Sequence, residues 1–155
     1  MNTHEEYMKY AIKLAQIALL RGDEPAGALV VFKGEVIGTG IESAKTSNNL
    51  TNRAEIIAIN TAIEFVNADV LKDSFLYSTR EPCLMCSFII RHYKMDRVIY
   101  GVPNDYYVGG HTSRIKILET KDIPSWGNAP VITTGVLKDN IAELRNQRFS
   151  RVNIN

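Results

Sequence analysis

Two cysteines and one glutamate are the residues of this chain whose types and spacing could support chemistry. Cys83 and Cys86 lie one helical turn apart directly after Pro82, and Glu55 lies just inside the start of another predicted helix. The outward-pointing N–H groups and the dipole at a helix start favour the thiolate form of such a cysteine. Because side chains three residues apart share one face of a helix, both sulfur atoms can hold a single ion. The spacing therefore favours a metal-type site.

The Cys-x-x-Cys pair has two other interpretations, which its spacing leaves open. The chain contains no cysteine besides these two, and an intracellular pair of this kind is more often a metal or redox site than a structural disulfide. A thioredoxin-like redox pair is the first alternative, although the sequence has neither the combined aromatic-glycine-proline surround of such pairs nor a second cysteine-rich feature. Two buried cysteines without a chemical role are the second alternative.

The elements that must position these residues alternate between helix and strand. The link Lys33-Gly34 between two apolar runs predicts an antiparallel hairpin, and a strand, the cysteine helix and a further strand predict a parallel βαβ unit. Thr51 or Asn52 can cap the helix that carries Glu55. The predicted helices cover residues 5–20, 53–67 and 138–148, with a cysteine helix ending near 93 and a short one around 113–118; the predicted strands cover 28–32, 35–40, 74–79, 97–102 and 130–134.

Length and composition indicate one domain spanning residues 1–155. The balance of 45% hydrophobic and 23% charged residues is that of an ordinary soluble globular protein. No apolar run approaches the length of a membrane span, and the first residues lack the basic and then apolar layout of a signal peptide. The cytoplasm is therefore the expected compartment. The net charge is +1, so no global electrostatic field favours nucleic acid.

Two motifs and their surroundings resemble the cytidine deaminase-like superfamily. Residues 50–59, followed by Glu81-Pro82-Cys83-Leu84-Met85-Cys86, are similar to its signature of His-x-Glu and then Pro-Cys-x-x-Cys. The branch that the chain resembles contains guanine deaminases, cytosine deaminases and bacterial tRNA adenosine deaminases. The similarity extends over nearly the whole chain, from residue 5 to residue 150, and includes Pro25-Ala26-Gly27-Ala28, the strand at 97–101 and Gly135-Val136-Leu137.

The resemblance implies an α/β fold of three layers, α/β/α, with a mixed central sheet of about five strands. It also implies zinc held by a histidine and two cysteines, with the fourth position left to a water that becomes hydroxide near neutral pH. Carried over position by position, Cys83 and Cys86 are the expected zinc ligands, and Glu55 is the expected catalytic proton shuttle. Relatives of this size commonly self-associate, so a homodimer is expected. The surface candidates for closing the pocket are Tyr106, Tyr107, Trp126 and the basic C-terminus.

Three departures from the superfamily pattern cluster around the expected pocket. Arg53 stands where the histidine ligand is expected, and a protonated guanidinium has no free lone pair for zinc. Glu42 stands where purine- and cytosine-acting relatives usually carry a base-binding asparagine, and Asn49-Leu50 replaces a typical Asp-Pro. We therefore predict Glu42, Arg53 and Asn48 as substrate-binding residues of a repurposed pocket. A negatively charged group should compensate the charge of Arg53, and the candidates are Glu42, Glu55 and the two thiolates.

Arg53 leaves three outcomes open for the metal. In the leading one, zinc is lost and Arg53 fills its place beside an acidic partner. In the second, zinc is held by Cys83, Cys86 and another group, for which His111 is the first substitute and His92 the next. In the third, the substrate or a small anion binds Arg53 directly. Zinc is thus the cofactor that the resemblance implies. Arg53 is the residue that argues against its binding.

Three functions of different classes follow from these features. The first is a deaminase of a small nucleobase- or nucleoside-like molecule that releases ammonia. The second is a catalytically silent relative that binds a nucleotide-like ligand or serves as a partner subunit. The third is an RNA-acting protein like the tRNA adenosine deaminases, for which Arg145, Arg148 and Arg151 at helical spacing could meet phosphates. Because such arginines more often form a solvated face, a small-molecule partner is expected and RNA is not.

Overall fold

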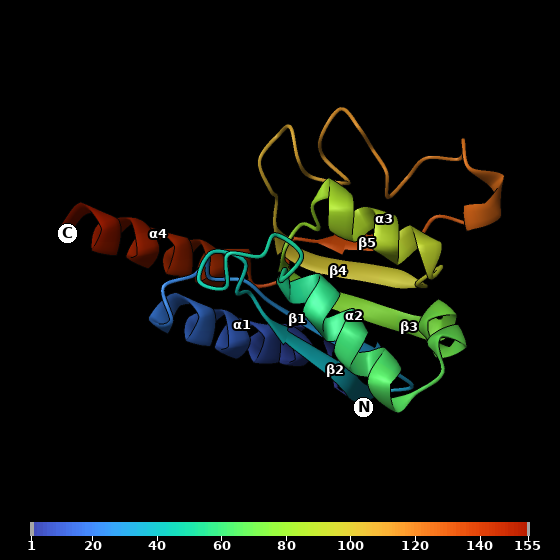
Figure 1. Ribbon diagram of the computed structural model, residues 1–155, viewed down its shortest axis with the longest axis horizontal. Coiled ribbons are helices and arrows are strands. Elements are labelled where there is room, and N and C mark those ends of the chain that lie inside the picture. The colour runs from blue at the N-terminus through green and yellow to red at the C-terminus, as the bar shows by residue number, and fades with distance from the viewer. Residues whose placement is uncertain (1, 155) are drawn as a thin grey trace.

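The computed structural model describes residues 2–154, and the side chains of residues 2–148. Within these residues, no helix is long and apolar enough to cross a bilayer. In chain order the elements are α1 (His4–Leu20), β1 (Gly27–Phe32), β2 (Glu35–Ile41), α2 (Ala54–Phe65), the 3₁₀ helix η1 (Ala68–Asp73), β3 (Ser74–Arg80), α3 (Leu84–His92), β4 (Arg97–Val102), the 3₁₀ helix η2 (Pro124–Trp126), β5 (Val131–Thr134) and α4 (Lys138–Ile154) (Figure 1).

The strands form one mixed five-stranded sheet in the order β2-β1-β3-β4-β5. β1 pairs antiparallel with β2 and with β3, whereas β3, β4 and β5 run parallel to one another. At the hairpin between β1 and β2, Lys33 and Gly34 both have positive φ angles, of 50° and 82°. Such turns match the right-handed twist of the flanking strands. The predicted hairpin and the predicted parallel βαβ unit are therefore both present.

Helices cover both faces of the sheet and give three layers. α1 and α4 pack on one face and α2 and α3 on the other (Figure 1). Successive residues of β1 serve the two cores in turn: Leu29 and Val31 face the first, and Ala28 and Val30 face the second. This alternation explains why the strand is apolar throughout its length. The predicted three-layer α/β/α fold with a mixed central sheet is confirmed.

Two glycines of β2 bring α2 unusually close to the sheet. A Cβ atom at Gly40 would lie 1.9 Å from the carbonyl oxygen of Ala54, and one at Gly38 would lie 2.2 Å from that of Ala58. Both contacts are with helix backbone, which cannot yield as a flexible side chain does. The small residues on both sides therefore fix the height of α2 above the sheet, and with it the position of Glu55 in the first turn.

The start of α2 differs from the prediction. Neither Thr51 nor Asn52 caps the helix; Arg53 is the N-cap residue and makes no side-chain capping hydrogen bond. The backbone N–H of Ala54 instead donates to Oε1 of Glu42, at 3.2 Å. A carboxylate from the end of β2 therefore satisfies a helix-start donor that would otherwise be orphaned.

The segment between β4 and β5 differs as well. Residues 113–118 form bends and turns instead of the predicted short helix. The backbone N–H of Ile115 donates to Oγ of Ser113 at 3.2 Å, a local bond that competes with helix formation. At the other end of the chain α4 continues to Ile154, six residues past the predicted end at 148.

Candidate functional site

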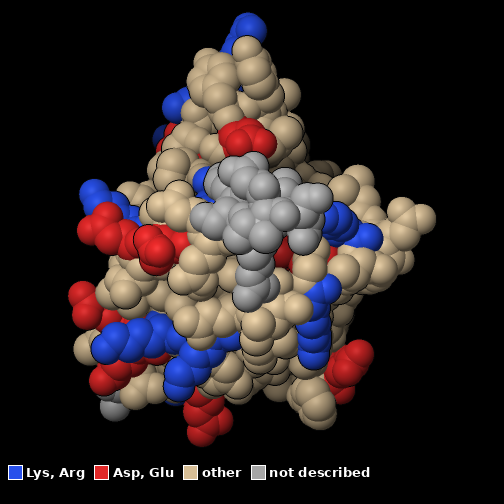
Figure 2. Space-filling view, turned by 90° about the vertical axis from the view of Figure 1, so that its left-hand side faces the viewer, with Lys and Arg blue, Asp and Glu red and all other residues tan. Residues whose placement is uncertain are grey.

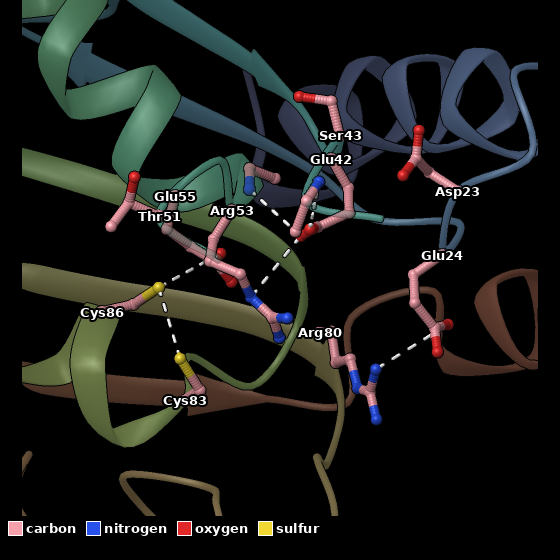
Figure 3. A network of polar contacts seen from close by, with 12 residues as sticks. Asp23, Glu24, Glu42, Ser43, Thr51, Arg53, Glu55, Arg80, Cys83 and Cys86 are labelled. Atoms are coloured by element: carbon pink, nitrogen blue, oxygen red, sulfur yellow. Dashed lines mark hydrogen bonds and ion pairs between the residues drawn. The ribbon is translucent and has the colours of Figure 1, made fainter. Parts of the chain in front are cut away.

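The candidate site lies at the carboxyl end of β3, where the N-termini of α2 and α3 meet (Figure 3). Cys83 is the N-cap residue of α3 and Cys86 lies in its first turn. Their Sγ atoms are 3.5 Å apart, and Sγ of Cys86 is 3.6 Å from Oε2 of Glu55. Three side chains thus converge, each in or next to a first helical turn; the spacing predicted this for the two cysteines, and the resemblance implied it for Glu55.

Glu55 is a buried carboxyl group with one strong polar partner. The hydroxyl of Ser78 lies 2.9 Å from Oε1 of Glu55 and 2.7 Å from the carbonyl oxygen of Arg80. Burial is the main cause that raises the pKa of Glu55, and the charge of Cys83 adds to it. Burial thus shifts Glu55 toward its protonated form, and a carboxyl group that exchanges a proton can act as a proton donor or acceptor in this pocket.

The two cysteines differ in acidity. The hydrogen bond from Cys86, with help from backbone N–H groups and Arg53, lowers the pKa of Cys83 to about 6 in spite of burial. The same hydrogen bond, followed by burial, raises the pKa of Cys86 well above its usual value. Near neutral pH the pair therefore consists of a thiolate at Cys83 and a thiol at Cys86 that donates to it.

Arg53 points from the start of α2 into the space between Glu42, Cys83 and Arg80 (Figure 3). Its Nε lies 3.7 Å from Oε1 of Glu42. Burial works to lower the pKa of Arg53, but the charges of Glu42, Cys83 and Glu55 outweigh it and raise the pKa above its ordinary value. The guanidinium stays charged, and among the described residues its buried Nε has no hydrogen-bond partner.

Glu42 is the acidic partner that the cation requires. Its side chain is buried, and besides the bond from Ala54 it accepts a longer one from the backbone N–H of Ala44 at 3.4 Å. Burial raises the pKa of Glu42, and Arg53 is the largest influence that opposes this. Of the candidate anions, Glu42 forms the ion pair with Arg53, while the thiolate of Cys83 acts on it through its charge.

Asn48 lies at the edge of this arrangement. It is exposed, has a positive φ of 51°, and lies in the loop between β2 and α2. Together with Glu42 and Arg53 it lines a polar hollow, so the structure brings the three predicted substrate-binding residues to one place. The other residues that line this hollow are Asp23, Glu24, Ala44, Lys45, Asn49 and Leu50.

Both ring nitrogens of His111 have partners other than the two cysteines. Its Nδ1 lies 2.6 Å from the hydroxyl of Tyr100, and its Nε2 lies 2.9 Å from Oε1 of Glu119. His92 lies among aromatic rings, next to Phe88. In the part of the chain that the structure describes, no group of three or more His, Cys, Asp or Glu side chains could hold a metal ion. His111 as a substitute for the histidine ligand remains a prediction, and in this structure both of its ring nitrogens are engaged by Tyr100 and Glu119.

Glu81 is a buried residue whose importance the sequence did not indicate. It precedes Pro82 and is fully buried. Its Oε2 accepts hydrogen bonds from the backbone N–H groups of His111 and Thr112, both at 2.9 Å, and its Oε1 accepts one from Asn104 at 3.2 Å. One carboxylate thus holds both ends of the loop that follows β4, at Asn104 and at His111 and Thr112. An acidic residue next to the Pro-Cys motif was visible, but its partners depend on the loop conformation.

Comparison with known proteins identifies the family. The model of the cytidine and deoxycytidylate deaminase zinc-binding region matches residues 1–102. This chain belongs to that family. The tRNA-specific adenosine deaminase 2 of Xenopus laevis is 31% identical over 97% of this chain and 89% of its own length. The tRNA-specific adenosine deaminase of Rickettsia bellii is 30% identical over 94% of this chain and 99% of its own.

Other deaminase relatives are similar in part or in fold. The chain is 39% identical, over 68% of its length, to the tRNA-specific adenosine deaminase subunit tad2 of Schizosaccharomyces pombe, but it spans only 28% of that protein. A structure from a study of A-to-I editing by tRNA:A34 deaminases has a TM-score of 0.80 at 30% identity, with 90% of this chain and 98% of that chain covered. A guanine deaminase from Nitrosomonas europaea, 20% identical with a TM-score of 0.77 over 96% and 86% of the two chains, shares the fold.

These relatives correct the expected partner. A small-molecule substrate was expected and RNA was considered unlikely, because the net charge is near zero and the terminal arginines were interpreted as a solvated face. That prediction is wrong: two relatives that are 30–31% identical to this chain over almost its whole length are named tRNA-specific adenosine deaminases, and a structure from a study of tRNA:A34 deaminases is also 30% identical to it. Net charge reports a global field and carries little information about a local binding surface.

The residues of this deaminase family member do not fit the zinc of its relatives. Catalytic zinc sites use three protein ligands from nitrogen, sulfur or oxygen donors. Among the described residues, the donors that lie together are the two sulfur atoms of Cys83 and Cys86, and the residue at the expected histidine position is Arg53, whose guanidinium has no lone pair to donate.

The buried carboxyl group of Glu55 gives a prediction for stability. Its folded-state pKa lies above the ordinary value of 4.5, so the unfolded chain loses this proton first as the pH rises, and the folded state becomes relatively less stable above pH 4.5. Glu55→Gln, which cannot ionise and still accepts from Ser78, should unfold about 2–4 °C higher than the wild type at pH 8. Near pH 4 the two proteins should unfold at the same temperature.

Thermal unfolding followed by circular dichroism across this pH range measures the difference. Glu64→Gln is the matched control, because Glu64 lies on the same helix but is exposed. Its unfolding temperature should follow that of the wild type at every pH. A Glu55→Gln protein that is less stable at pH 8 would show that the ionised carboxylate is the form the pocket stabilises.

Proposed function

We propose that this chain is a tRNA adenosine deaminase-like protein whose partner is a tRNA that presents an unpaired adenine base. The observation that carries the proposal is the similarity of 30–31%, over almost the full length of both chains, to proteins named as tRNA-specific adenosine deaminases. A solved structure from a study of tRNA:A34 deaminases, with a TM-score of 0.80, supports the same partner.

Two exposed aromatic rings at the rim of the site support a single-stranded ligand. Tyr106 and Tyr107 are 57% and 77% exposed, and their ring centroids are 5.1 Å apart. The loop that carries them is attached to the cysteine turn, because the backbone N–H of Leu84 donates to the carbonyl oxygen of Val108 at 2.8 Å. Unpaired bases stack on such rings, and stacking is the usual way in which proteins hold the bases of RNA loops.

The positive charges near the site are local. The side chain of Arg80 is 13% exposed, and burial, followed by the charge of Arg145 on α4, lowers its pKa. Arg148 on the same helix contacts Glu24, while the side chain of Arg151 lies outside the described residues. On the end of the molecule that Figure 2 shows, basic and acidic side chains are interspersed. We therefore expect a few phosphate contacts instead of a broad electrostatic attraction.

The test is binding of RNA to the full-length protein by fluorescence anisotropy over a range of salt concentrations. One probe is a tRNA anticodon stem-loop with an unpaired adenosine, and the other is a fully paired RNA of the same length. The stem-loop should bind about 10-fold more tightly than the duplex, and its salt dependence should correspond to about two or three phosphate contacts. Equal affinity for both RNAs, or binding to neither, contradicts the proposal.

Tyr107→Ala should weaken stem-loop binding by about 5-fold or more, because stacking contributes at least ~1 kcal/mol per base. Tyr10→Ala is the matched control, since Tyr10 is an exposed tyrosine on α1, on the opposite face of the sheet, and its loss should leave the affinity unchanged. Inosine in the RNA, measured by mass spectrometry on the same samples, reports hydrolysis separately from binding.

A further inference from the structure

We propose that Arg53 is the resident cation of this site: its guanidinium occupies the place of a metal ion between Glu42 and the Cys83–Cys86 pair and keeps zinc out. The proposal goes beyond the RNA partner and does not depend on it. It rests on the donors that this chain brings together, on the cation that lies among them, and on the acidic residue that accompanies this cation.

The donor set is incomplete in a specific way. Two sulfur atoms 3.5 Å apart leave a tetrahedral metal short of at least one protein ligand. Within the described residues no further His, Cys, Asp or Glu side chain completes a group of three. Glu55, the nearest carboxylate, lies 3.6 Å from Cys86 through Oε2, and its Oε1 is engaged by Ser78. The place of the third ligand belongs to the N-cap residue of α2, and that residue is Arg53.

The positive charge of Arg53 at the start of α2 is compensated by an acidic side chain. A positive charge at a helix N-terminus is unfavourable with respect to the helix dipole, so it must be held by other groups. Glu42 supplies such a group, because its buried side chain places Oε1 3.7 Å from Nε of Arg53. The carboxylate and the guanidinium thus form one ion pair at the start of α2, in which the arginine provides the positive charge that a metal ion would bring.

The surroundings of Arg53 also indicate how the metal site could be recovered. Glu42 is buried and lies beside the place where a histidine at position 53 would stand. Ligating histidines commonly donate their second ring N–H to a carboxylate, which orients the ring and raises its basicity. Arg53→His therefore adds the missing donor next to a carboxylate that can hold it, while Cys83 and Cys86 are already in position.

The experiment is the zinc content of the full-length protein, purified without chelator, incubated with zinc sulfate and freed of excess metal by gel filtration. The wild type should carry much less than one zinc per chain, and its unfolding temperature should not respond to zinc. Arg53→His should carry about one zinc per chain and unfold several degrees higher when zinc is present, because a metal that binds only the folded state stabilises it. Cobalt(II) bound to Arg53→His should show thiolate-to-metal absorption.

Two control variants separate the roles of the residues. Arg53→Gln removes the guanidinium without adding a donor that suits zinc, so it should remain free of metal. Arg53→His combined with Cys83→Ser should lose the zinc that Arg53→His takes up. A wild-type protein with one zinc per chain that is lost in Cys83→Ser overturns the proposal, and this result does not require any variant of Arg53 to fold. A folded Arg53→His protein that takes up no zinc also overturns it. Neither readout involves RNA, so RNA binding and metal exclusion can fail independently.

Discussion

Replacement of Glu81 by alanine should lower the free energy of unfolding by about 3–5 kcal/mol, the largest effect expected for a single substitution at the rim of this site. The carboxylate is fully buried and accepts three backbone N–H groups, together with the hydroxyl of Thr112 at 2.6 Å. Hydrogen bonds to a charged acceptor are among the strong ones, and removal of the acceptor leaves buried donors without a partner. The loss is measured by urea unfolding.

Two comparisons show that this effect comes from the buried carboxylate. Glu81→Gln keeps an acceptor oxygen but places an amide N–H₂ group against backbone donors, so it should recover only part of the stability. Glu119→Ala removes an acidic group that contacts the same loop through His111, but its side chain is 46% exposed, so the cost should stay below ~1 kcal/mol. If Glu81→Ala and Glu119→Ala were equally mild, the loop would not depend on Glu81.

Replacement of Arg91 by methionine should cost about 3 kcal/mol and release the segment between β4 and β5. Arg91 is 1% exposed and has no carboxylate partner in the described structure. Its guanidinium donates to the carbonyl oxygens of Ile117 and Thr120 at 2.9 and 3.0 Å and lies 5.1 Å from the ring centroid of Trp126. Methionine fills a similar volume but donates nothing, so buried carbonyl groups lose their partners.

The readouts are the unfolding temperature and limited proteolysis, in which residues 113–127 should become the first site of cleavage. Arg97→Met is the matched control, because Arg97 also lies over an aromatic ring, 5.2 Å from the centroid of Phe75, but its side chain is 44% exposed. Arg97→Met should change stability by less than ~1 kcal/mol and leave the cleavage pattern unaltered. Unchanged proteolysis of Arg91→Met would show that the segment is held by other contacts.

The fold and the centre of the site could be predicted because their signals are local. Apolar periodicity defines the strands and helices, and the short spacing of Cys83 and Cys86 after a strand places both at one helix start. Glu55 was expected beside them because residues 50–59 resemble the His-x-Glu motif of the superfamily. The ion pair between Glu42 and Arg53 was among the candidates, since a cation at a helix start requires an anion.

The remaining features depend on tertiary contacts that leave no local pattern. The cap of α2 comes from Glu42 on a different element, so Thr51 and Asn52, which fit the capping rule, are not used. Glu81 acts through backbone groups of a loop whose conformation has no periodicity. The partner of the chain depends on a surface, and neither the net charge nor the spacing of arginines on a terminal helix describes that surface adequately.

The attachment of the tyrosine loop to the cysteine turn has a consequence for the energetics of ligand binding. Backbone hydrogen bonds join Val108 to Leu84 and Gly110 to Pro82, and Cys83 pairs with Gly109 in an isolated antiparallel β-bridge. Residues 106–110 and the turn that carries the thiolate therefore cannot shift independently. We expect a base whose binding shifts residues 106–110 to change the affinity of the Cys83 sulfur for a proton or another ligand. By thermodynamic reciprocity, that ligand changes the affinity for the base by the same factor. Ligand binding at the tyrosine loop and at the cysteine turn should therefore be coupled.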